Sequence, residues 1–250
     1  MNLKGKTAII TGSTKGIGKA LAECLAQAGA NTVIVSRTEA DCVKTADEIR
    51  DKYNAEVFAC PADVTKLSDI ENLVQKTKEK YGTIDILINN AGAAITKRAE
   101  DITEADWDGI LNVDLKGVFF MAQAVGKVMI SQKYGKIINI ASILGHVGDR
   151  QVLPYCAAKG GVIQITKALA LEWAKYNINV NALCPGYIVT DLNRDALNQE
   201  KIAKHTLGKI AFKRYGQVED LKGACLFLSS DASSYMTGQS LIIDGGWTCE

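Results

Sequence analysis

Tyr155 and Lys159 stand four residues apart, and side chains of these two types could together transfer a proton. On a helix, this spacing places both side chains on the same face, one above the other. A lysine ammonium held beside a tyrosine hydroxyl favours the phenolate, so it lowers the pKa of the tyrosine from about 10 toward working pH. Such a tyrosine is a candidate general acid or base. The same spacing also occurs on helix surfaces without a chemical role, so the interpretation depends on the rest of the chain.

A glycine-rich stretch near the N-terminus offers a place for a phosphate-bearing ligand. It follows the first predicted strand and opens the first predicted helix, with the spacing Gly-x-x-x-Gly-x-Gly. Glycines let the backbone approach a ligand closely, and a helix N-terminus offers free amides to a pyrophosphate. The spacing is a variant of the usual Gly-x-Gly-x-x-Gly fingerprint, and a tight turn without a ligand is the alternative. The predicted contacts are Gly12, Ser13, Thr14, Lys15, Gly16, Ile17 and Gly18.

The end of the second predicted strand indicates which nicotinamide dinucleotide binds. In the NAD-binding version, an acidic residue about 20 positions after the glycines holds the ribose 2′-hydroxyl. Here the strand ends in Ser36, Arg37 and Thr38, without a carboxylate. Arg37 can form a bidentate contact with a 2′-phosphate, and Lys15 adds positive charge from the glycine turn. We therefore expect NADP(H). The alternative is that Arg37 is solvated and that Glu39 or another acid contacts the ribose.

Short apolar runs rich in β-branched residues alternate with longer amphipathic segments. The runs are almost continuously hydrophobic, which is typical of parallel strands covered on both faces. The predicted strands are Thr7 to Thr11, Asn31 to Val35, Glu56 to Cys60, Ile84 to Ile88, Lys136 to Ala141, Asn179 to Leu183 and Ser240 to Ile243. The predicted helices are Ile17 to Ala28, Ala40 to Tyr53, Ser68 to Tyr81, Glu104 to Gln132 and Pro154 to Tyr176. This order predicts a Rossmann-like α/β fold, with a doubly wound, mostly seven-stranded parallel sheet and helices on both faces.

The domain organisation follows from length and regularity. A chain of 250 residues with 47% hydrophobic content is within reach of one α/β domain, so we expect a single dinucleotide-binding catalytic domain over residues 1–250. No linker, internal repeat or low-complexity segment divides it. The least regular stretch, residues 186–215, is polar and charged after a Pro-Gly break. It is either a mobile substrate lid or an ordinary pair of surface helices.

Composition argues against several classes of partner. With 29 basic and 28 acidic residues, the net charge of +1 gives no electrostatic footprint for nucleic acid or an anionic membrane. No apolar run approaches the roughly 20 residues of a membrane span, and the chain starts without a signal-peptide core. Seven scattered cysteines and only two histidines fit reduced thiols and predict no metal site. We expect a cytoplasmic protein.

Further motifs follow the strands in a fixed order. They are Asp63-Val64, Asn89-Asn90-Ala91-Gly92, Ser142, Pro185-Gly186 with Thr190, and Asp244-Gly245-Gly246. Together with the glycine turn and the Tyr155/Lys159 pair, they make the chain similar to the classical short-chain dehydrogenases/reductases from its first strand to its last. The resemblance implies a Rossmann-like fold, a nicotinamide cofactor and hydride transfer to or from a carbonyl or alcohol carbon.

The resemblance also implies roles for individual residues. Ser142 would hydrogen-bond the substrate oxygen, Tyr155 would donate its proton during reduction, and Lys159 would lower the tyrosine pKa and hold the nicotinamide ribose. This division is chemically sensible, because hydride arrival leaves an alkoxide-like oxygen that needs a donor in place. The remaining implied cofactor contacts are Asp63 and Val64 at the adenine, Asn90, Ala91 and Gly92 at the adenosine ribose, and Pro185, Gly186, Ile188 and Thr190 at the nicotinamide.

One implied catalytic position departs from the family. Where the family commonly has an asparagine in its long fourth helix, this chain has Asp114, in a register fixed by Trp107 and the run Leu115-Lys116-Gly117. If the family's asparagine works mainly through its backbone carbonyl and a bound water, Asp114 can substitute. If the side-chain amide is needed, activity or its pH dependence should be altered. An ionised carboxylate there would favour a charged Lys159 and so raise the pKa of the lysine.

The substrate is the least determined part of the function. The chain resembles both 3-oxoacyl-carrier-protein reductases and gluconate 5-dehydrogenase-like members. The predicted function is therefore NADP(H)-dependent interconversion of a ketone and a secondary alcohol, with a small-molecule 3-oxoacyl thioester or keto-sugar acid as substrate. His146 is expected to contact the substrate pocket rather than to catalyse. A catalytically idle NADP(H)-binding regulatory protein is the alternative.

The resemblance also implies a homotetramer, since closed symmetric assemblies are usual for such enzymes. Its candidate interfaces are the long helices after Glu104 and Pro154 and the C-terminal residues 240–250.

Overall fold

The centre of the molecule is a parallel sheet. The computed structural model describes residues 1–191 and 193–249, and in them seven parallel strands pair in the order β3-β2-β1-β4-β5-β6-β7. The strands are β1 (Thr7–Thr11), β2 (Asn31–Val35), β3 (Val57–Ala59), β4 (Ile86–Asn89), β5 (Gly135–Ile140), β6 (Ile178–Pro185) and β7 (Ser240–Ile243). The chain reverses its direction of travel across the sheet between β1 and β4, and ligands bind at the carboxyl ends of strands at such a point. The predicted doubly wound parallel sheet is confirmed.

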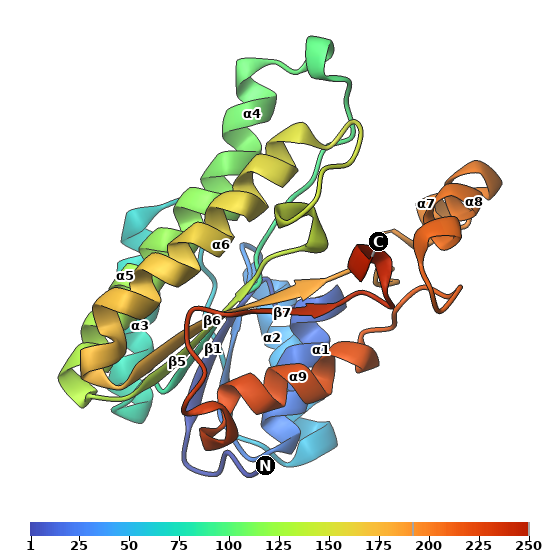
Figure 1. The fold of residues 1–250 in the computed structure, drawn as a ribbon. Coiled ribbons are helices and arrows are strands. Elements are labelled where there is room, and N and C mark those ends of the chain that lie inside the picture. Colours follow the sequence, from blue (N-terminus) through green and yellow to red (C-terminus); the bar gives the residue numbers. More distant parts are fainter. Residues whose placement is uncertain (192, 250) are drawn as a thin grey trace.

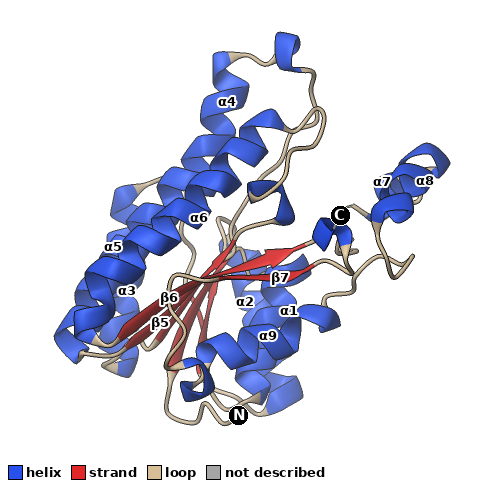
Figure 2. Ribbon diagram, in the orientation of Figure 1, coloured by secondary structure: helices blue, strands red, loops and turns tan. Residues whose placement is uncertain are grey.

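Helices cover both faces of the sheet (Figure 1), so the strands lie between two helical layers (Figure 2). One layer contains α1 (Gly16–Gln27), α2 (Glu39–Tyr53) and α9 (Glu219–Ser229). The other contains α3 (Leu67–Tyr81), α5 (Val118–Gln132) and α6 (Leu153–Trp173). The predicted helices are confirmed to within a few residues at their ends, apart from the break described below, whereas α9 was not among them.

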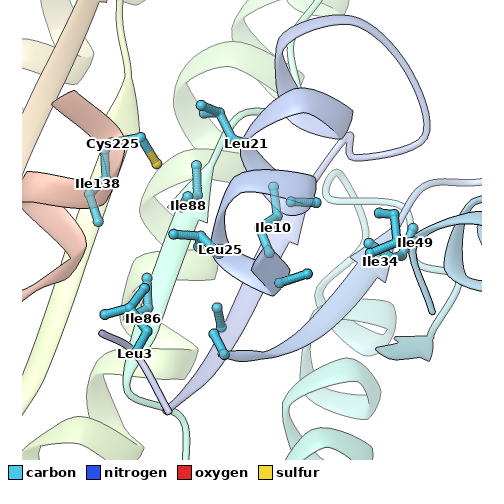
Figure 3. Close-up of a cluster of buried hydrophobic side chains, with 14 of the residues drawn as sticks. Leu3, Ile10, Leu21, Leu25, Ile34, Ile49, Ile86, Ile88, Ile138 and Cys225 are labelled. Carbon is cyan, nitrogen blue, oxygen red and sulfur yellow. The ribbon is translucent and has the colours of Figure 1, made fainter. Parts of the chain in front are cut away.

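The alternation of side chains along each strand builds a separate hydrophobic core on each face. Ile10 of β1 packs with Leu21 and Leu25 of α1 and with Ile88 of β4 (Figure 3). The preceding residue, Ile9, points to the opposite layer and packs in the second core. Because both faces are buried, the strands need no polar alternation, which explains the continuous hydrophobic runs of the sequence.

A π-helical turn, η2 (Asn112–Gly117), interrupts the helix predicted from Glu104 to Gln132. The prediction of one regular helix is therefore wrong at this point: α4 (Glu104–Leu111) precedes the turn and α5 follows it. Gly117 allows the turn to lie close to the loop after β3, since a Cβ at this position would be 2.9 Å from the carbonyl oxygen of Val64. π turns are uncommon and occur frequently at functional sites.

Residues 186–215 contain two helices, α7 (Arg194–Leu197) and α8 (Glu200–Lys209), which lie at one side of the body near the C-terminal end of the chain (Figure 1). Leu192 lies outside the described residues. The Tyr215 hydroxyl donates a hydrogen bond of 3.0 Å to the carbonyl of Leu197, which ties the end of the segment to α7. Closure of this segment over a substrate stays a prediction. None of the helices in the described part of the chain is long and apolar enough to cross a membrane.

The contact between α5 and α6 predicts opposite effects for two glycine-to-alanine substitutions. A Cβ on Gly126 of α5 would lie 2.6 Å from Cη2 of Trp173, whereas nothing lies within 4 Å of a Cβ on Gly223 of α9. Alanine favours a helix over glycine by about 1 kcal/mol, but overpacking a core costs about 1–3 kcal/mol. Gly126→Ala should therefore lower, and Gly223→Ala raise, the urea midpoint of unfolding. Equal shifts in the two variants would contradict the close α5/α6 contact.

Candidate active site

The glycine-rich turn after β1 is shaped by close backbone approaches. Gly12 has a φ of +64°, and a Cβ there would lie 3.0 Å from the Cα of Ala91. A Cβ on Gly18 would collide with the carbonyl oxygen of Gly12 and with the Asn90 side chain. Only glycine fits these two positions without distortion. α1 begins at Gly16, and its N-cap residue, Lys15, makes no capping side-chain hydrogen bond. The first-turn amides of α1 are therefore not capped by Lys15 and suit an anion.

Two predicted cofactor contacts, Ser13 and Asn90, use their side chains to hold this turn in place. The Ser13 hydroxyl donates to the carbonyl of Ile10 at 2.7 Å and accepts from the amide of Val35 at 2.9 Å, so it links β1 to β2. The Asn90 amide donates to the carbonyls of Thr11 and Gly12 at 2.9 and 3.1 Å. Both side chains therefore support the turn from within the protein. A direct contact of either residue with a cofactor stays a prediction.

The end of β2 presents positive charge beside the glycine turn. Arg37 and Lys15 are exposed, and no carboxylate of the described residues forms an ion pair with either of them. Asp63, which follows β3, is an acid whose ionisation Arg37 affects. Burial would raise the pKa of Asp63, but hydrogen bonds from Thr65 and the charge of Arg37 outweigh it and lower that pKa. The region keeps two free cations where the sequence predicts a 2′-phosphate.

The turn after β5 packs the segment that begins at Ser142 against α6, the helix that carries Tyr155. Ser142 follows β5 and is 8% exposed, and its hydroxyl oxygen accepts a 3.1 Å hydrogen bond from the amide of Leu144. The short helix that it caps packs on α6, since a Cβ on Gly145 would be 2.7 Å from the carbonyl oxygen of Lys159. The capping bond uses only the acceptor side of the hydroxyl. Its proton can still be donated to a ligand.

Lys159 lies at the centre of the predicted catalytic residues. Its side chain is buried, and Nζ donates to the carbonyl of Ile140 at 3.0 Å. The same Nζ is 5.3 Å from the ring centroid of Tyr155 and 3.1 Å from Oδ2 of Asp114. Burial alone would lower the pKa of Lys159. The Tyr155 phenol group and the Asp114 carboxylate outweigh this effect and raise it.

Asp114 reaches this centre from the π turn. Its side chain is fully buried, and Oδ1 accepts a 2.7 Å hydrogen bond from the amide of Ala93, just after β4. A Cβ on Gly92 would lie 3.0 Å from Oδ2, so the chain after β4 runs directly past the carboxylate. Burial raises the pKa of Asp114, and the charge of Lys159 opposes that rise. The sequence predicted the position of this residue but not the direct contact of its carboxylate with Lys159.

The residues predicted for the nicotinamide end lie beyond β6. Pro185 ends that strand, and a Cβ on Gly186 would be 2.8 Å from Cα of Asp244, so this turn is fixed against the end of β7. Ile188 is buried at 5% exposure and supports the loop from below. Thr190 lies beside the glycine turn, since a Cβ on Gly16 would be 3.4 Å from its methyl group. This segment therefore lies against both the end of β7 and the glycine turn after β1.

Comparison with known proteins gives a consistent result. A family model described as enoyl-(acyl carrier protein) reductase matches residues 12–248. An NAD-dependent glycerol dehydrogenase of Listeria innocua is 40% identical over 247 residues, which cover 99% of this chain and 95% of the relative. A 3-oxoacyl-[acyl-carrier-protein] reductase of Thermotoga maritima is 41% identical over 249 residues, covering 98% and 99%. The chain belongs to the classical short-chain dehydrogenase/reductase family. The predicted family and its oxidoreductase class are confirmed.

A solved structure from the same family extends the comparison. The gluconate 5-dehydrogenase of Burkholderia cenocepacia, in complex with NADP and tartrate, superimposes with a TM-score of 0.96 at 38% identity and covers 100% of this chain and 97% of its own. Relatives of this short-chain dehydrogenase/reductase thus include proteins named for either nicotinamide dinucleotide. A nicotinamide cofactor and a keto or hydroxyl substrate are therefore shown for the family.

The end of β6 and the loops after β5 and β6 make contacts that the sequence did not predict. Cys184 is fully buried near Lys159, and its Sγ is 3.7 Å from Nε2 of His146. Burial raises the pKa of the Cys184 thiol to about 11, so it stays protonated at neutral pH. The Tyr187 hydroxyl donates a 2.8 Å hydrogen bond to Asp149 and so joins the loops after β6 and β5. His146 is exposed on the rim that the loops after β5 and β6 form.

No group of three or more His, Cys, Asp or Glu side chains suited to a metal ion occurs in residues 1–191 and 193–249.

Proposed function

We propose that this protein is an NADP(H)-dependent oxidoreductase that interconverts a ketone and a secondary alcohol by hydride transfer, with Tyr155 as the general acid or base. The observation that carries the proposal is the placement of Lys159. Its Nζ lies 5.3 Å from the Tyr155 ring centroid and donates a hydrogen bond to the carbonyl of Ile140, at the end of β5. Ser142 follows that strand end by two residues. These positions support a site at the carboxyl edge of the sheet in which a proton donor, a cation and a hydroxyl act together.

The residues present fit a nicotinamide dinucleotide. A Cβ at Gly12 or Gly18 would clash with protein atoms, so glycine keeps the backbone of the turn close-packed beside the N-terminus of α1, where amides suit a pyrophosphate. Arg37 and Lys15 would hold the 2′-phosphate, with Ser36 and Thr38 as neighbouring hydroxyls. When bound, the nicotinamide would supply or accept the hydride. Lys159 would hold its ribose, and the segment Pro185 to Thr190 would cover the ring.

The three catalytic side chains would divide the proton chemistry between them. The Ser142 hydroxyl would donate a hydrogen bond to the substrate oxygen, because its acceptor side is already used by Leu144. Tyr155 would give its proton to that oxygen during reduction and take it back during oxidation. The ammonium of Lys159 would stabilise the phenolate that remains after the transfer. Because these groups are held before the substrate arrives, little reorganisation is needed at the moment of reaction.

The substrate class is a 3-oxoacyl thioester or a keto-sugar acid. Relatives that cover nearly the whole chain are named for both classes. The rim after β5 is polar, with His146 and Arg150 exposed and Asp149 bonded to Tyr187. This polarity favours a small hydroxylated acid, whereas an acyl chain would need the apolar rim residues Val147 and Leu153, which are 38% and 45% exposed. Both classes undergo the same ketone–alcohol exchange.

The first prediction for this function concerns cofactor choice. NADPH should bind more tightly than NADH, because Arg37 and Lys15 supply positive charge and the end of β2 carries no carboxylate. Arg37→Asp should weaken NADPH binding by at least about tenfold, or about 1.4 kcal/mol, and should lessen discrimination against NADH. Lys175→Glu, which makes the same charge change beyond the far end of α6, should leave both affinities unchanged. Fluorescence titration measures this, and equal or tighter NADH binding by the unaltered protein would exclude NADP(H) preference.

The second prediction concerns the chemistry. A panel of 3-oxoacyl thioesters, keto-sugar acids and steroid ketones, followed as NADPH consumption, should contain a substrate from one of the first two groups. Tyr155→Phe should lower kcat on that substrate by about 10²–10⁴-fold while NADPH still binds, because only the transferable proton is removed. Lys159→Ala should weaken both turnover and NADPH binding. Normal turnover by Tyr155→Phe would remove the tyrosine from its assigned role, and tight NADPH binding with no turnover on any substrate would favour the regulatory alternative.

The third prediction concerns assembly. We propose a homotetramer built through the long helices and residues 240–250, of which Glu250 lies outside the described residues. Leu171 on α6 is apolar and 84% exposed, which fits an interface on this helix. Light scattering should give the mass of four chains, and Leu171→Glu should reduce it. Leu67→Glu on α3, where the side chain is 48% exposed, is the matched control. The mass of a single chain at every concentration would refute the assembly.

A further inference from the structure

Two groups of the protein itself orient the ammonium of Lys159. A lysine ammonium has three donors and no acceptor. One donor is used by the carbonyl of Ile140 at 3.0 Å, and the Asp114 carboxylate lies 3.1 Å away on another side. The remaining donors can be directed toward the Asp114 carboxylate, Tyr155 or a ligand. The direction in which Lys159 can act is therefore set by Ile140 and Asp114 before any ligand binds.

The Asp114 carboxylate connects two separate parts of the site. Oδ1 accepts the Ala93 amide at 2.7 Å, which fixes the chain just after Gly92. Oδ2 faces Lys159, and no described residue gives it a well-aligned hydrogen bond. The π turn places Asp114 where both contacts are possible from one side chain. The two oxygens of one carboxylate therefore serve both parts of the site.

We propose that the Asp114 carboxylate is a positioning residue, which holds Lys159 charged and correctly placed while fixing the loop at Ala93. The inference rests on the proposed function. It adds which atoms of Asp114 act on Lys159: the side-chain oxygens, and not the backbone carbonyl with a bound water. It differs from a structural role because it makes the charge of Lys159 depend on the charge of Asp114.

The charged and titratable groups around Lys159 make the sign of this dependence definite. Tyr155 faces it from α6, Asp114 from the π turn and Cys184 from β6, while β5 presents the uncharged carbonyl of Ile140. A carboxylate beside an ammonium stabilises the protonated lysine. Neutralising Asp114 therefore lets Lys159 lose its proton at lower pH. Any property that needs the charged lysine is then lost at lower pH on the alkaline side.

The test compares two substitutions at Asp114. Asp114→Asn keeps the shape and the oxygen that accepts from Ala93 but removes the charge. Two pH profiles should each shift to lower pH by about one unit. One is the fall in NADPH turnover at alkaline pH, and the other is the fall in NADPH affinity at alkaline pH, measured without substrate. Asp114→Ala removes both contacts and should lower kcat by about a further tenfold. Asp108→Asn, an exposed aspartate on α4, is the matched control and should behave like the unaltered protein.

The outcomes separate this inference from the proposed function. The role of the carboxylate would be overturned if NADPH affinity fell at the same alkaline pH in the unaltered protein and in Asp114→Asn. Absence of turnover on every substrate would count against the proposed function alone, because the binding series still compares the variants. Should Asp114→Asn fail to fold, Lys159→Arg gives a second test, since a guanidinium stays charged. Its NADPH affinity should show no alkaline loss, and a persisting loss would overturn the assignment to Lys159.

Discussion

The buried ammonium of Lys159 is the constraint around which the catalytic half of the molecule is built. An uncompensated ammonium in a protein interior costs several kcal/mol, so each neighbour must offset that cost. The end of β5 contributes the Ile140 carbonyl, and the π turn contributes the Asp114 carboxylate. Both require α6 to pack tightly on its surroundings. Gly161 makes this possible, since a Cβ there would lie 2.7 Å from Leu115 of the π turn.

The residues predicted to bind the dinucleotide are under a different electrostatic constraint. The whole chain has a net charge of only +1, so long-range attraction of an anionic ligand is weak. Positive potential is instead built locally, from the α1 N-terminus and from the free cations Lys15 and Arg37. The hydrogen bonds of Ser13 and Asn90 hold the backbone of this turn in place without using the ligand. The glycines are required because a Cβ at Gly12 or Gly18 would clash with the close-packed backbone of the turn.

Sequence patterns predicted the sheet and most helices, because these depend on hydrophobic periodicity, and they named candidate catalytic residues from motifs at fixed places along the chain. The π turn at Asn112–Gly117 could not be predicted, since the hydrophobic pattern does not distinguish it from a regular helix, whereas in the fold Gly117 lies close to Val64 and Leu115 lies close to Gly161 of α6. The same limit applies to Asp114. Its residue type was evident, but whether its side chain or its backbone faces Lys159 is decided by tertiary packing. Ser13 was placed correctly in the turn, yet its direction toward β2 depends on a hydrogen bond across strands.

Substrate choice is separated physically from this framework. The predicted dinucleotide contacts and Ser142 follow strands of the sheet, and Tyr155 and Lys159 lie on α6, whereas the rim comes from the loops after β5 and β6. Those loops are joined to each other and to the chain after β4 by few bonds, among them Tyr187 to Asp149 and the Lys97 amide to the Gln151 carbonyl. Loop residues can therefore change without disturbing Lys159. Relatives at about 40% identity, named for glycerol and for oxoacyl thioesters, fit this division, because one rigid site can serve different loops.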